Sequence, residues 1–540
     1  MVAKVTILDG YLDEPSCLGV PPYIAPHVRY TYGALKEAGL KQEEINYLTV
    51  DQFRDKKDKT LQLKDSKLVI VIAGTTVPGK YLGGKPISIA EIEDLAQQLS
   101  TPEVIVSGPI INCDLELDYI DHLAYEIPGL LAYEKLTNSK PLDKYKPAQI
   151  IDNWAKLGAE VTTLHPNYPE LVCEIETFRG CPRSNNCSFC SEGFKELTYH
   201  RSVDGVIKEI EALYKQGNRY FRLGAQTDLL LFQAKKKDNR LLPNPEAIKK
   251  LYSGIRKVAP DLKVLHMDNI NPATIVDYPK QAEKILKTIA NYNTAGDIAA
   301  FGLESADPKV LKANKIGTTA DKTFKAIKMV NQITGFRERG VPKLLPGINL
   351  LHGLKGERAE TMELNFKFLK RVLDAGLLLR RINIRQVNPI GKYQTAHYNK
   401  YQFKEYKKQV NHKINQPMLK KVFPSGTLLE EVIIEEIRGK ISFGRQLGTY
   451  PILVGIPGQY QLGEKLDIKV IDHGFRSITG IPYPFNINQA SIDQLEALPG
   501  IGKNRSTKLF MAGEIKSLDH LGQILDGYDV SQLEEIVTFS

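Results

Sequence analysis

Short apolar segments alternate with segments of helical spacing through the first part of the chain. Apolar runs predict strands at residues 4–8, 68–73 and 104–107, and helical spacing predicts helices at 29–38 and 88–99. Strands without polar interruptions are typical of parallel sheets that helices cover on both faces. Residues 1–145 are therefore expected to form a Rossmann-like α/β domain.

A second alternation of strands and helices starts at Leu171 and repeats six times. The predicted strands are residues 171–177, 220–223, 263–267, 298–303, 344–351 and 381–387. The helical stretches between them are residues 202–216, 246–259, 279–292, 320–333 and 359–375. Six uninterrupted strand–helix units predict a partial (β/α)6 barrel over residues 166–395. In parallel barrels the functional groups lie where strands end and loops begin.

The pattern changes after Val387, and three smaller regions are predicted. Residues 396–445 are rich in lysine and favour a basic helical connector. Residues 446–484 contain short apolar runs between glycines, which predict a small β-barrel-like module. Residues 485–540 have helical spacing around a tight glycine turn. The predicted fold class is thus α/β, followed by a small β module and a C-terminal helical domain.

The composition indicates a soluble globular chain of several domains. Of its 540 residues, 42% are hydrophobic and 25% are charged, which is ordinary for such proteins. No apolar window approaches the ~18 residues of a membrane span. The N-terminus runs directly into a strand-like segment and lacks the apolar core of a signal peptide. We therefore expect a cytoplasmic protein with no membrane-embedded part.

The charge of the chain is unevenly distributed. The net charge of +9, from 72 basic and 63 acidic residues, permits a polyanionic partner. Residues 400–421 hold seven lysines against one glutamate, whereas residues 486–540 hold four basic and eight acidic residues. This segregation favours local docking of a partner over a uniformly basic surface.

Three of the six cysteines, Cys181, Cys187 and Cys190, lie within ten residues of one another. Thiolates are soft ligands that suit zinc and iron–sulfur clusters. Three on one loop can bind three irons of a [4Fe–4S] cluster and leave the fourth iron open. The loop follows the first predicted barrel strand, which is where barrel chemistry is expected.

The residues alone leave other interpretations of these cysteines open. A structural zinc site needs a fourth ligand, which His200 can supply. Unrelated surface thiols are a further alternative. A disulfide is disfavoured, because a reducing compartment keeps thiols free.

The segment Phe-Arg-Gly-Cys181-Pro, followed by Cys187-Ser-Phe-Cys190, resembles the cluster loop of the radical S-adenosylmethionine (SAM) superfamily. The resemblance covers about residues 168–395. The family's common spacing is three residues and then two, whereas here it is five and then two. The resemblance implies a [4Fe–4S] cluster on these catalytic cysteines, SAM as the second cofactor and an external electron donor.

The same resemblance implies which residues contact SAM. They lie on the cysteine loop and at the ends of strands two, four, five and six, and are Phe189, Gly224, Gln226, Glu304, Ser305, Asn349 and Gln386. In the implied mechanism, one electron from the cluster cleaves SAM to methionine and a 5′-deoxyadenosyl radical, which abstracts a hydrogen atom from the substrate. The protein contributes placement of the cofactor and exclusion of water.

The sequence Pro-Gly-Ile-Gly-Lys at 499–503 resembles the hairpin of a helix-hairpin-helix motif, and Ser491 suits the N-cap of its first helix. In such motifs the glycine amides and the second helix's N-terminus bind a nucleic-acid phosphate. The implied nucleic-acid-binding residues are Gly500, Gly502, Lys503 and Arg505. A protein-docking or purely structural role is the alternative, because this region is net negative.

Residues 453–480 resemble the small RNA-binding β-barrel of tRNA methylthiotransferases, whose domain order also matches this chain. Those enzymes hold a second cluster on three N-terminal cysteines, but here only the widely spaced Cys17, Cys113 and Cys173 remain. The N-terminal domain also resembles cobalamin-binding folds, although it lacks their Asp-x-His-x-x-Gly motif.

Together these patterns predict a radical SAM enzyme that modifies RNA, with tRNA as the favoured substrate. Radical modification of a protein or a small molecule is a second candidate, in which the C-terminal region docks a partner. A non-catalytic iron–sulfur protein that binds nucleic acid is a third.

Overall fold

The N-terminal part of the chain forms a five-stranded parallel sheet. The computed structural model describes residues 5–12, 22–55, 61–74, 84–113, 118–125, 127–183, 185–238, 240–397 and 399–539. The strands, in spatial order, are β3 (Ile45–Thr49), β1 (Val5–Asp9), β4 (Leu68–Ile72), β5 (Glu103–Ser107) and β6 (His122–Ala124). The order reverses between β1 and β4, and open α/β sheets bind ligands at the carboxyl ends of such strands.

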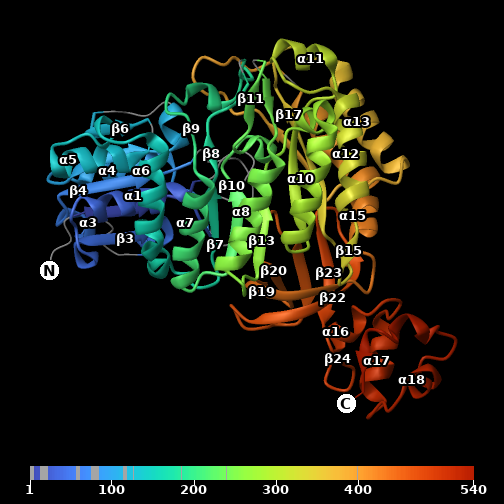
Figure 1. The fold of residues 1–540 in the computed structure, drawn as a ribbon. Coiled ribbons are helices and arrows are strands. Elements are labelled where there is room, and N and C mark those ends of the chain that lie inside the picture. Colours follow the sequence, from blue (N-terminus) through green and yellow to red (C-terminus); the bar gives the residue numbers. More distant parts are fainter. Residues whose placement is uncertain are drawn as a thin grey trace.

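Helices cover both faces of this sheet (Figure 1). They are α1 (Pro26–Glu37), α2 (Val50–Arg54), α3 (Leu61–Lys64), α4 (Ile89–Gln98), α5 (Pro128–Thr137) and α6 (Pro147–Leu157). Successive residues of β4 face opposite sides. Ile70 packs in one hydrophobic cluster with Leu35 of α1, and Val71 packs in another with Ile92 of α4. The expected Rossmann-like α/β arrangement is confirmed.

Six parallel strands and their helices form the central part of the molecule (Figure 1). The strands are β7 (Val172–Glu176), β10 (Tyr220–Gly224), β13 (Val264–Met267), β14 (Asp297–Glu304), β17 (Leu344–His352) and β18 (Arg381–Gln386). The main helices around them are α7 (Val203–Lys215), α8 (Pro245–Val258), α10 (Pro279–Tyr292), α12 (Ala320–Thr334) and α13 (Ala359–Asp374). A parallel bridge between Asn269 and Ala300 joins the sheet of β7, β10 and β13 to the sheet of β14, β17 and β18. The result is the expected partial barrel.

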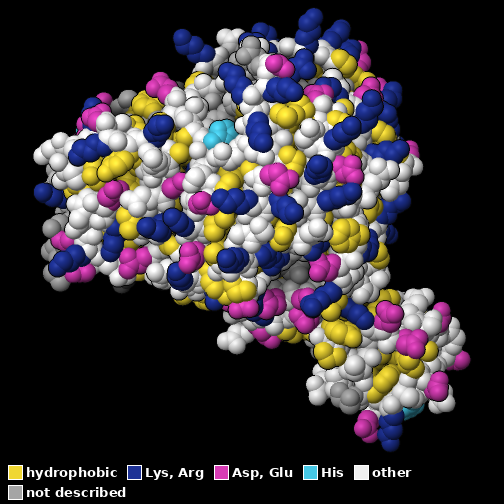
Figure 2. All heavy atoms as spheres, viewed as in Figure 1, with side chains coloured by type: hydrophobic (Ala, Val, Ile, Leu, Met, Phe, Trp, Pro, Cys, Tyr) yellow, Lys and Arg dark blue, Asp and Glu magenta, His cyan; other side chains and the backbone are white. Residues whose placement is uncertain are grey.

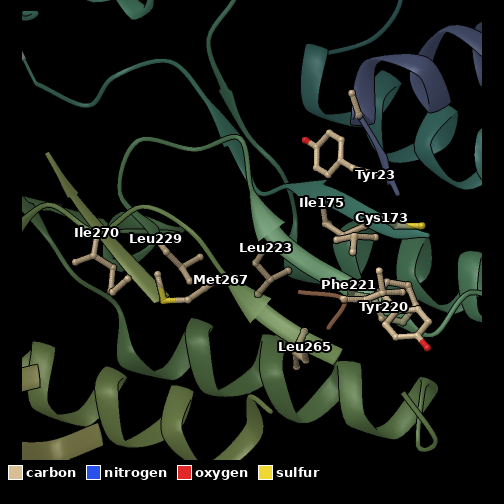
Figure 3. Packing of buried hydrophobic residues seen from close by; sticks show 14 of the residues in the cluster. Tyr23, Cys173, Ile175, Tyr220, Phe221, Leu223, Leu229, Leu265, Met267 and Ile270 are labelled. Atoms are coloured by element: carbon tan, nitrogen blue, oxygen red, sulfur yellow. The ribbon is translucent and has the colours of Figure 1, made fainter. Parts of the chain in front are cut away.

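The two faces of the first barrel strands differ in polarity. Ile175, Leu223 and Met267 occupy neighbouring positions on β7, β10 and β13 and pack as one apolar row beside the helices (Figure 3). At the adjacent positions, Glu174 lies next to Arg222, and Arg222 lies next to His266. Because side chains alternate along a strand, this polar row faces the inside of the barrel.

The N-terminal part is tied to the barrel by a strand and by a buried ion-pair network. The two-residue strand β2 (Tyr23–Ile24) pairs in parallel with β7. Glu209 of α7 accepts hydrogen bonds from Arg29 of α1 and from Arg201, and all three side chains are fully buried. Arg29 also donates to the backbone carbonyl of Glu174. The network therefore supports the strand that leads into the cysteine loop.

A closed five-stranded β-barrel follows a short helical segment. The helices are α14 (Lys400–Val410) and α15 (Gln416–Val422). The strands, in spatial order, are β19 (Leu428–Arg438), β20 (Ile441–Arg445), β21 (Leu453–Pro457), β23 (Ser477–Pro482) and β22 (Lys465–His473). The expected boundary at residue 446 is wrong, since the first two strands lie inside the predicted helical connector. β19 has irregular register at two places, so its buried residues do not alternate strictly and resemble a helical pattern.

The loop between β20 and β21 docks this small barrel onto the large one. The Tyr450 hydroxyl donates to Asp268, which follows β13, at 2.8 Å. The Thr449 amide donates to Nδ1 of His266 at 2.9 Å. A Cβ on Gly448 would lie 2.8 Å from the His266 ring, so the close approach requires glycine. The small β-barrel is therefore joined directly to the polar interior of the large barrel.

The last part of the chain projects from the small β-barrel (Figure 1). It consists of β24 (Phe485–Asn486), α16 (Ile492–Glu496), α17 (Lys503–Met511), α18 (Leu518–Ile524) and β25 (Val537–Thr538). Its apolar residues form a separate small core that also includes Ile471 and Ile481 of the small β-barrel. Among the described residues, no helix is long and apolar enough to cross a membrane.

Candidate active site

The cysteine loop leaves the barrel immediately after β7. Its base is a short antiparallel pair of β8 (Phe178–Arg179) and β9 (Tyr199–His200). Gly180 begins the loop with a φ of +96°, and a Cβ there would lie 2.6 Å from the Thr198 side chain. Glycine before the first cysteine is thus required by backbone conformation and by space.

The loop is fixed on its far side by the segment that follows α11 (Pro308–Ala313). The Ser188 amide donates to the carbonyl of Asn314 at 3.1 Å. Arg183 donates to the carbonyl of Lys315 at 2.7 Å and to the Cys187 sulfur at 3.1 Å. These contacts hold the cysteine loop across the mouth of the barrel.

All three loop cysteines line one cavity of about 330 Å³, at the carboxyl ends of the barrel strands. The part of the chain that the structure describes holds no three His, Cys, Asp or Glu side chains that converge on a single metal ion. A [4Fe–4S] cluster does not require such convergence, because each thiolate binds a different iron. Burial raises the pKa of Cys190 to about 12. Iron binding displaces the thiol proton, and a raised pKa adds to the cost of that step. The residues fit the cluster because the three thiols lie on one loop and line one cavity.

Most of the predicted SAM-contacting residues share this cavity with the cysteines. Phe189, Gln226, Glu304, Asn349 and Gln386 all line it. They come from the cysteine loop and from the ends of four different barrel strands. Burial raises the pKa of Glu304 to about 8, and its backbone has a φ of +63°. An isolated carboxyl group in a constrained conformation is suited to holding a polar part of a ligand.

Two of the residues predicted to contact SAM, Gly224 and Ser305, do not line the cavity. Gly224 backs onto Glu174, whose Oε1 would lie 2.0 Å from a Cβ at this position. Ser305 is fully buried, and its hydroxyl accepts a hydrogen bond from the Asp307 amide at 3.1 Å. The Ser305 hydroxyl oxygen lies 3.4 Å from Oδ1 of Asn365. Gly224 thus makes room for a side chain that does line the cavity, and Ser305 shapes the loop after β14. A direct contact of Ser305 with the cofactor is not supported by its position.

His200, the alternative fourth zinc ligand, is placed elsewhere. Its ring stacks on Phe178 with a centroid distance of 4.7 Å, and it is not among the residues that line the cavity. The remaining cysteines are also scattered. Cys173 is buried in β7 with its sulfur 3.4 Å from Asn218, Cys113 is half-buried, and Cys17 lies outside the described residues.

A charged network under the cavity was not predicted from the sequence. Arg222 forms 2.7 Å ion pairs with Glu174 and with Asp268, and both carboxylates also line the cavity. Its guanidinium lies 5.3 Å from the centre of the Tyr450 ring. The only sequence signal was the presence of charged residues at alternate positions of otherwise apolar strands. This network connects the cavity floor to the small β-barrel.

The N-terminal domain also contributes to the cavity wall. Leu12, Pro109 and Asn112 lie after β1 and β5, at the carboxyl edge of its sheet. Tyr23 and His27 add a second group from the segment that begins α1. The cavity therefore lies between the two α/β units, where the carboxyl ends of both sheets meet.

Asp228, two residues beyond Gln226, makes a pH-dependent contribution to stability. Burial raises its pKa to about 7, although hydrogen bonds from Thr274 and from backbone amides oppose that rise. The folded state therefore keeps a proton that the unfolded state loses above about pH 4, so stability falls as the pH rises towards 7.

An Asp228→Asn variant is expected to escape this loss. Its amide can donate to the Thr274 hydroxyl, which now donates to Oδ2 at 2.6 Å. Its unfolding free energy relative to wild type should rise by on the order of 1 kcal/mol per pH unit from about pH 4 to 7. Urea unfolding at several pH values measures this, with the exposed Asp204→Asn as control. A flat difference across that range would show that Asp228 is ionised in the folded state.

The predicted nucleic-acid-binding residues lie together but far from the cavity, on the projecting C-terminal part (Figure 1). Gly500 has a φ of +67° in the tight turn, and Gly502 is the N-cap of α17. Lys503 is exposed in the first turn of that helix. Arg505 donates to the carbonyl of Gly500 at 2.8 Å, and its guanidinium lies 5.0 Å from the centre of the Tyr528 ring.

Known proteins are similar to this chain in its barrel and over most of its length. Residues 175–369 match the Radical SAM superfamily. An uncharacterised protein of Archaeoglobus fulgidus is 41% identical over 92% of this chain and 93% of its own length. An uncharacterised protein of Methanocaldococcus jannaschii is 40% identical, covering 89% of this chain and 93% of its own length. The ribosomal protein uS12 methylthiotransferase RimO of Flavobacterium psychrophilum is 28% identical over 63% of this chain and 73% of its own length.

The matched segment begins in β7 and ends in α13, so it spans the cysteine loop and the first five barrel strands. This family membership brings a [4Fe–4S] cluster and SAM as cofactors, which agrees with the three cysteine thiols in the cavity. Residues 175–369 of this chain form a domain of the Radical SAM superfamily of iron–sulfur enzymes.

Proposed function

We propose that this enzyme modifies an RNA, with tRNA as the substrate class, at the cavity between its two α/β units. The observation that carries the proposal is the shared cavity, which brings Cys181, Cys187 and Cys190 together with Gln226, Glu304 and Asn349. We assign the cluster to the three cysteines. We assign the binding of SAM to these three polar residues together with Phe189 and Gln386.

The chain's own residues would position the cofactors and exclude water. When bound, the reduced cluster supplies the electron that cleaves SAM and yields a 5′-deoxyadenosyl radical. The Gln226 side chain is fixed in the cavity wall by two contacts. Its amide donates to the carbonyl of Leu223 at 3.1 Å, and its Oε1 lies 3.3 Å from the Thr177 hydroxyl. The Asn383 amide likewise donates to Oδ1 of Asn349 at 3.1 Å. Such pre-ordered polar groups fix a ligand without reorganisation.

Two features outside the cavity support RNA as the substrate. The small closed β-barrel is docked through Tyr450 onto the charged network under the cavity, so a macromolecule bound to it would contact a module that is linked to the cavity floor. The C-terminal part presents Lys503 at the exposed start of α17 beside a tight glycine turn.

Protein modification is the second candidate, and one relative favours it. RimO is named for a ribosomal protein, uS12, and it covers much of this chain. In that case the C-terminal part would dock a protein partner. A substrate screen separates the two candidates: the enzyme with SAM and reductant is given either bulk tRNA or ribosomal proteins, and mass spectrometry finds which one gains mass.

The C-terminal motif is tested by its contribution to RNA binding. A Lys503→Gln/Arg505→Gln double variant should bind bulk tRNA more weakly, with the slope of log affinity against log salt reduced by about two. Fluorescence anisotropy at several salt concentrations measures both quantities. The control is Lys516→Gln, which removes an exposed charge from the same region. Wild-type affinity in the double variant would remove this motif from the RNA-binding surface.

A further inference from the structure

Three separate elements at the last barrel strand each carry a cationic side chain of one group. Arg385 lies on β18, Lys407 on α14, and Arg476 in the turn between β22 and β23. The elements are packed together at this point. The rings of His412 and Phe475 lie 4.2 Å apart, and the Gln416 amide donates to the carbonyl of His473 at 2.8 Å.

The positive charges of this group lie close enough to repel one another. Partial burial lowers the pKa of Lys407, and the charges of Arg476 and then Arg385 lower it further. Partial loss of solvent likewise lowers the pKa of Arg476, with a further contribution from the charge of Arg385. No carboxylate of the described residues forms an ion pair with any of the three. The group is therefore a concentrated positive charge without a carboxylate counter-ion among the residues that the structure describes.

One nitrogen of this group is buried without a partner. Nη1 of Arg385 is shielded from solvent and makes no hydrogen bond within the described structure. Leaving a charged donor buried and unpaired is costly. Other arginines of the described structure also have one buried nitrogen without a partner, but Arg201 and Arg222 each pair with a carboxylate, whereas Arg385 pairs with none of those described. An anion from outside the chain would supply the negatively charged acceptor that the Arg385 guanidinium lacks.

The group is connected to the active-site cavity by a short line of side chains. Nε of Arg385 donates to Oδ1 of Asn383 at 3.1 Å, and the Asn383 amide donates to Asn349 at 3.1 Å. Both asparagines line the cavity. A ligand held by Arg385 would thus be placed next to the cavity and linked to a residue assigned to SAM.

We propose that Arg385, Lys407 and Arg476 bind a backbone phosphate of the nucleic-acid substrate and thereby position the target nucleotide at the cavity. This inference rests on the proposed RNA-modifying function and adds a specific subsite to it. Three donors from different directions match the several acceptor oxygens of a phosphodiester. The exposed Arg476 and half-buried Lys407 leave the site open to a large ligand.

The surface around the group favours a long polyanion over a single acidic side chain. Residues 400–421 carry seven lysines and one glutamate, and α14 and α15 are built from this segment. Figure 2 shows that Lys and Arg side chains are frequent over the side of the molecule where α13 and α15 lie in Figure 1. Such a surface attracts successive phosphates along a strand.

The experiment measures binding of fluorescent bulk tRNA to the reconstituted full-length enzyme, with Arg385→Gln, Lys407→Gln and Arg476→Gln variants. Each variant is expected to bind about tenfold more weakly, the loss of one charge-assisted hydrogen bond, and to lower the salt slope by about one. The matched control is Lys367→Gln on α13, an exposed lysine that pairs with Glu363. Thermal melting checks folding, and the exposed position of Arg476 makes its variant the decisive one if Arg385→Gln melts early.

The outcomes separate this site from the general function. Weakened binding in the three variants, with an unchanged control and competition by unlabelled RNA but not by polyglutamate, supports the phosphate site. Tight tRNA binding that Arg476→Gln and Lys407→Gln leave unchanged overturns the site and leaves the proposed function in place. Absence of tRNA binding by wild type, or stronger competition by polyglutamate, overturns both the site and the RNA-modifying function.

Discussion

Replacing Cys181, Cys187 or Cys190 with alanine should abolish SAM cleavage and remove most of the bound iron. All three thiols line the same cavity, and each would bind a separate iron. Changes to the partners of metal ligands already cost about 10–100-fold in metal affinity or activity, so loss of a direct ligand costs more. Formation of 5′-deoxyadenosine under anaerobic reducing conditions and the iron content of each variant measure the effect.

A matched cysteine variant separates ligand loss from a general effect of removing thiols. Cys173→Ala changes a buried thiol on β7, the strand that leads into the cysteine loop. The Cys173 sulfur contacts Asn218 and does not line the cavity. Figure 3 shows Cys173 among the apolar residues packed on β7 and β10. This variant should keep its iron and its cleavage activity. Full cleavage in all three loop variants would refute the assignment of the cluster.

A Glu209→Leu variant should lose about 3–5 kcal/mol of unfolding free energy, because it leaves two buried guanidinium groups without their shared carboxylate. Arg201 also donates to the carbonyl of Glu176 at 3.1 Å. The damage should therefore reach β7 and the cysteine loop after it. Urea unfolding of the apoprotein measures the loss of stability.

The pH dependence of this effect has a definite sign. Burial alone would raise the pKa of Glu209, but the charges of Arg201 and Arg29 outweigh it and hold the pKa below its usual value. The ion pair therefore adds to the free energy of unfolding above the unfolded-state pKa of Glu209. This contribution is lost as the pH falls through the lower pKa of the folded state. The stability difference between wild type and variant should shrink in acid.

Glu211→Leu, on the same helix, is the control for Glu209. Its carboxylate pairs with Lys215 on the exposed surface, four residues along the helix. Such pairs contribute about 0.5 kcal/mol or less. Equal losses in the two variants would mean that the buried network does not hold the N-terminal part to the barrel.

The sequence predicted the barrel well because its signals are local. The strand expected at 220–223 is β10 (Tyr220–Gly224), and the helix expected at 279–292 is α10 (Pro279–Tyr292). Uninterrupted apolar runs and helical spacing are properties of neighbouring residues, so no tertiary information is needed. The same holds for the cysteine loop, whose position follows from the end of the first strand.

The missed features depend on tertiary contacts between distant segments. Tyr450 joins the network of Arg222 and Asp268 from more than 180 residues away, and nothing in its local sequence indicates a partner. Asn112 reaches the cavity only because the carboxyl ends of the two sheets meet there. The boundary of the small β-barrel was wrong because the irregular register of β19 disrupts the two-residue period. Ser305 was expected at the cofactor from its place in the sequence, but its side chain turns to Asn365 instead.

The measurement that tests the central claim most directly is the metal content of the anaerobically reconstituted enzyme, together with its cleavage of SAM. The account predicts about four irons and four sulfides per chain, bound through the Cys181–Cys190 loop, and 5′-deoxyadenosine on addition of SAM and reductant. About eight irons would add a second cluster and favour sulfur insertion as the reaction. One tightly bound zinc, with no 5′-deoxyadenosine, would contradict the account.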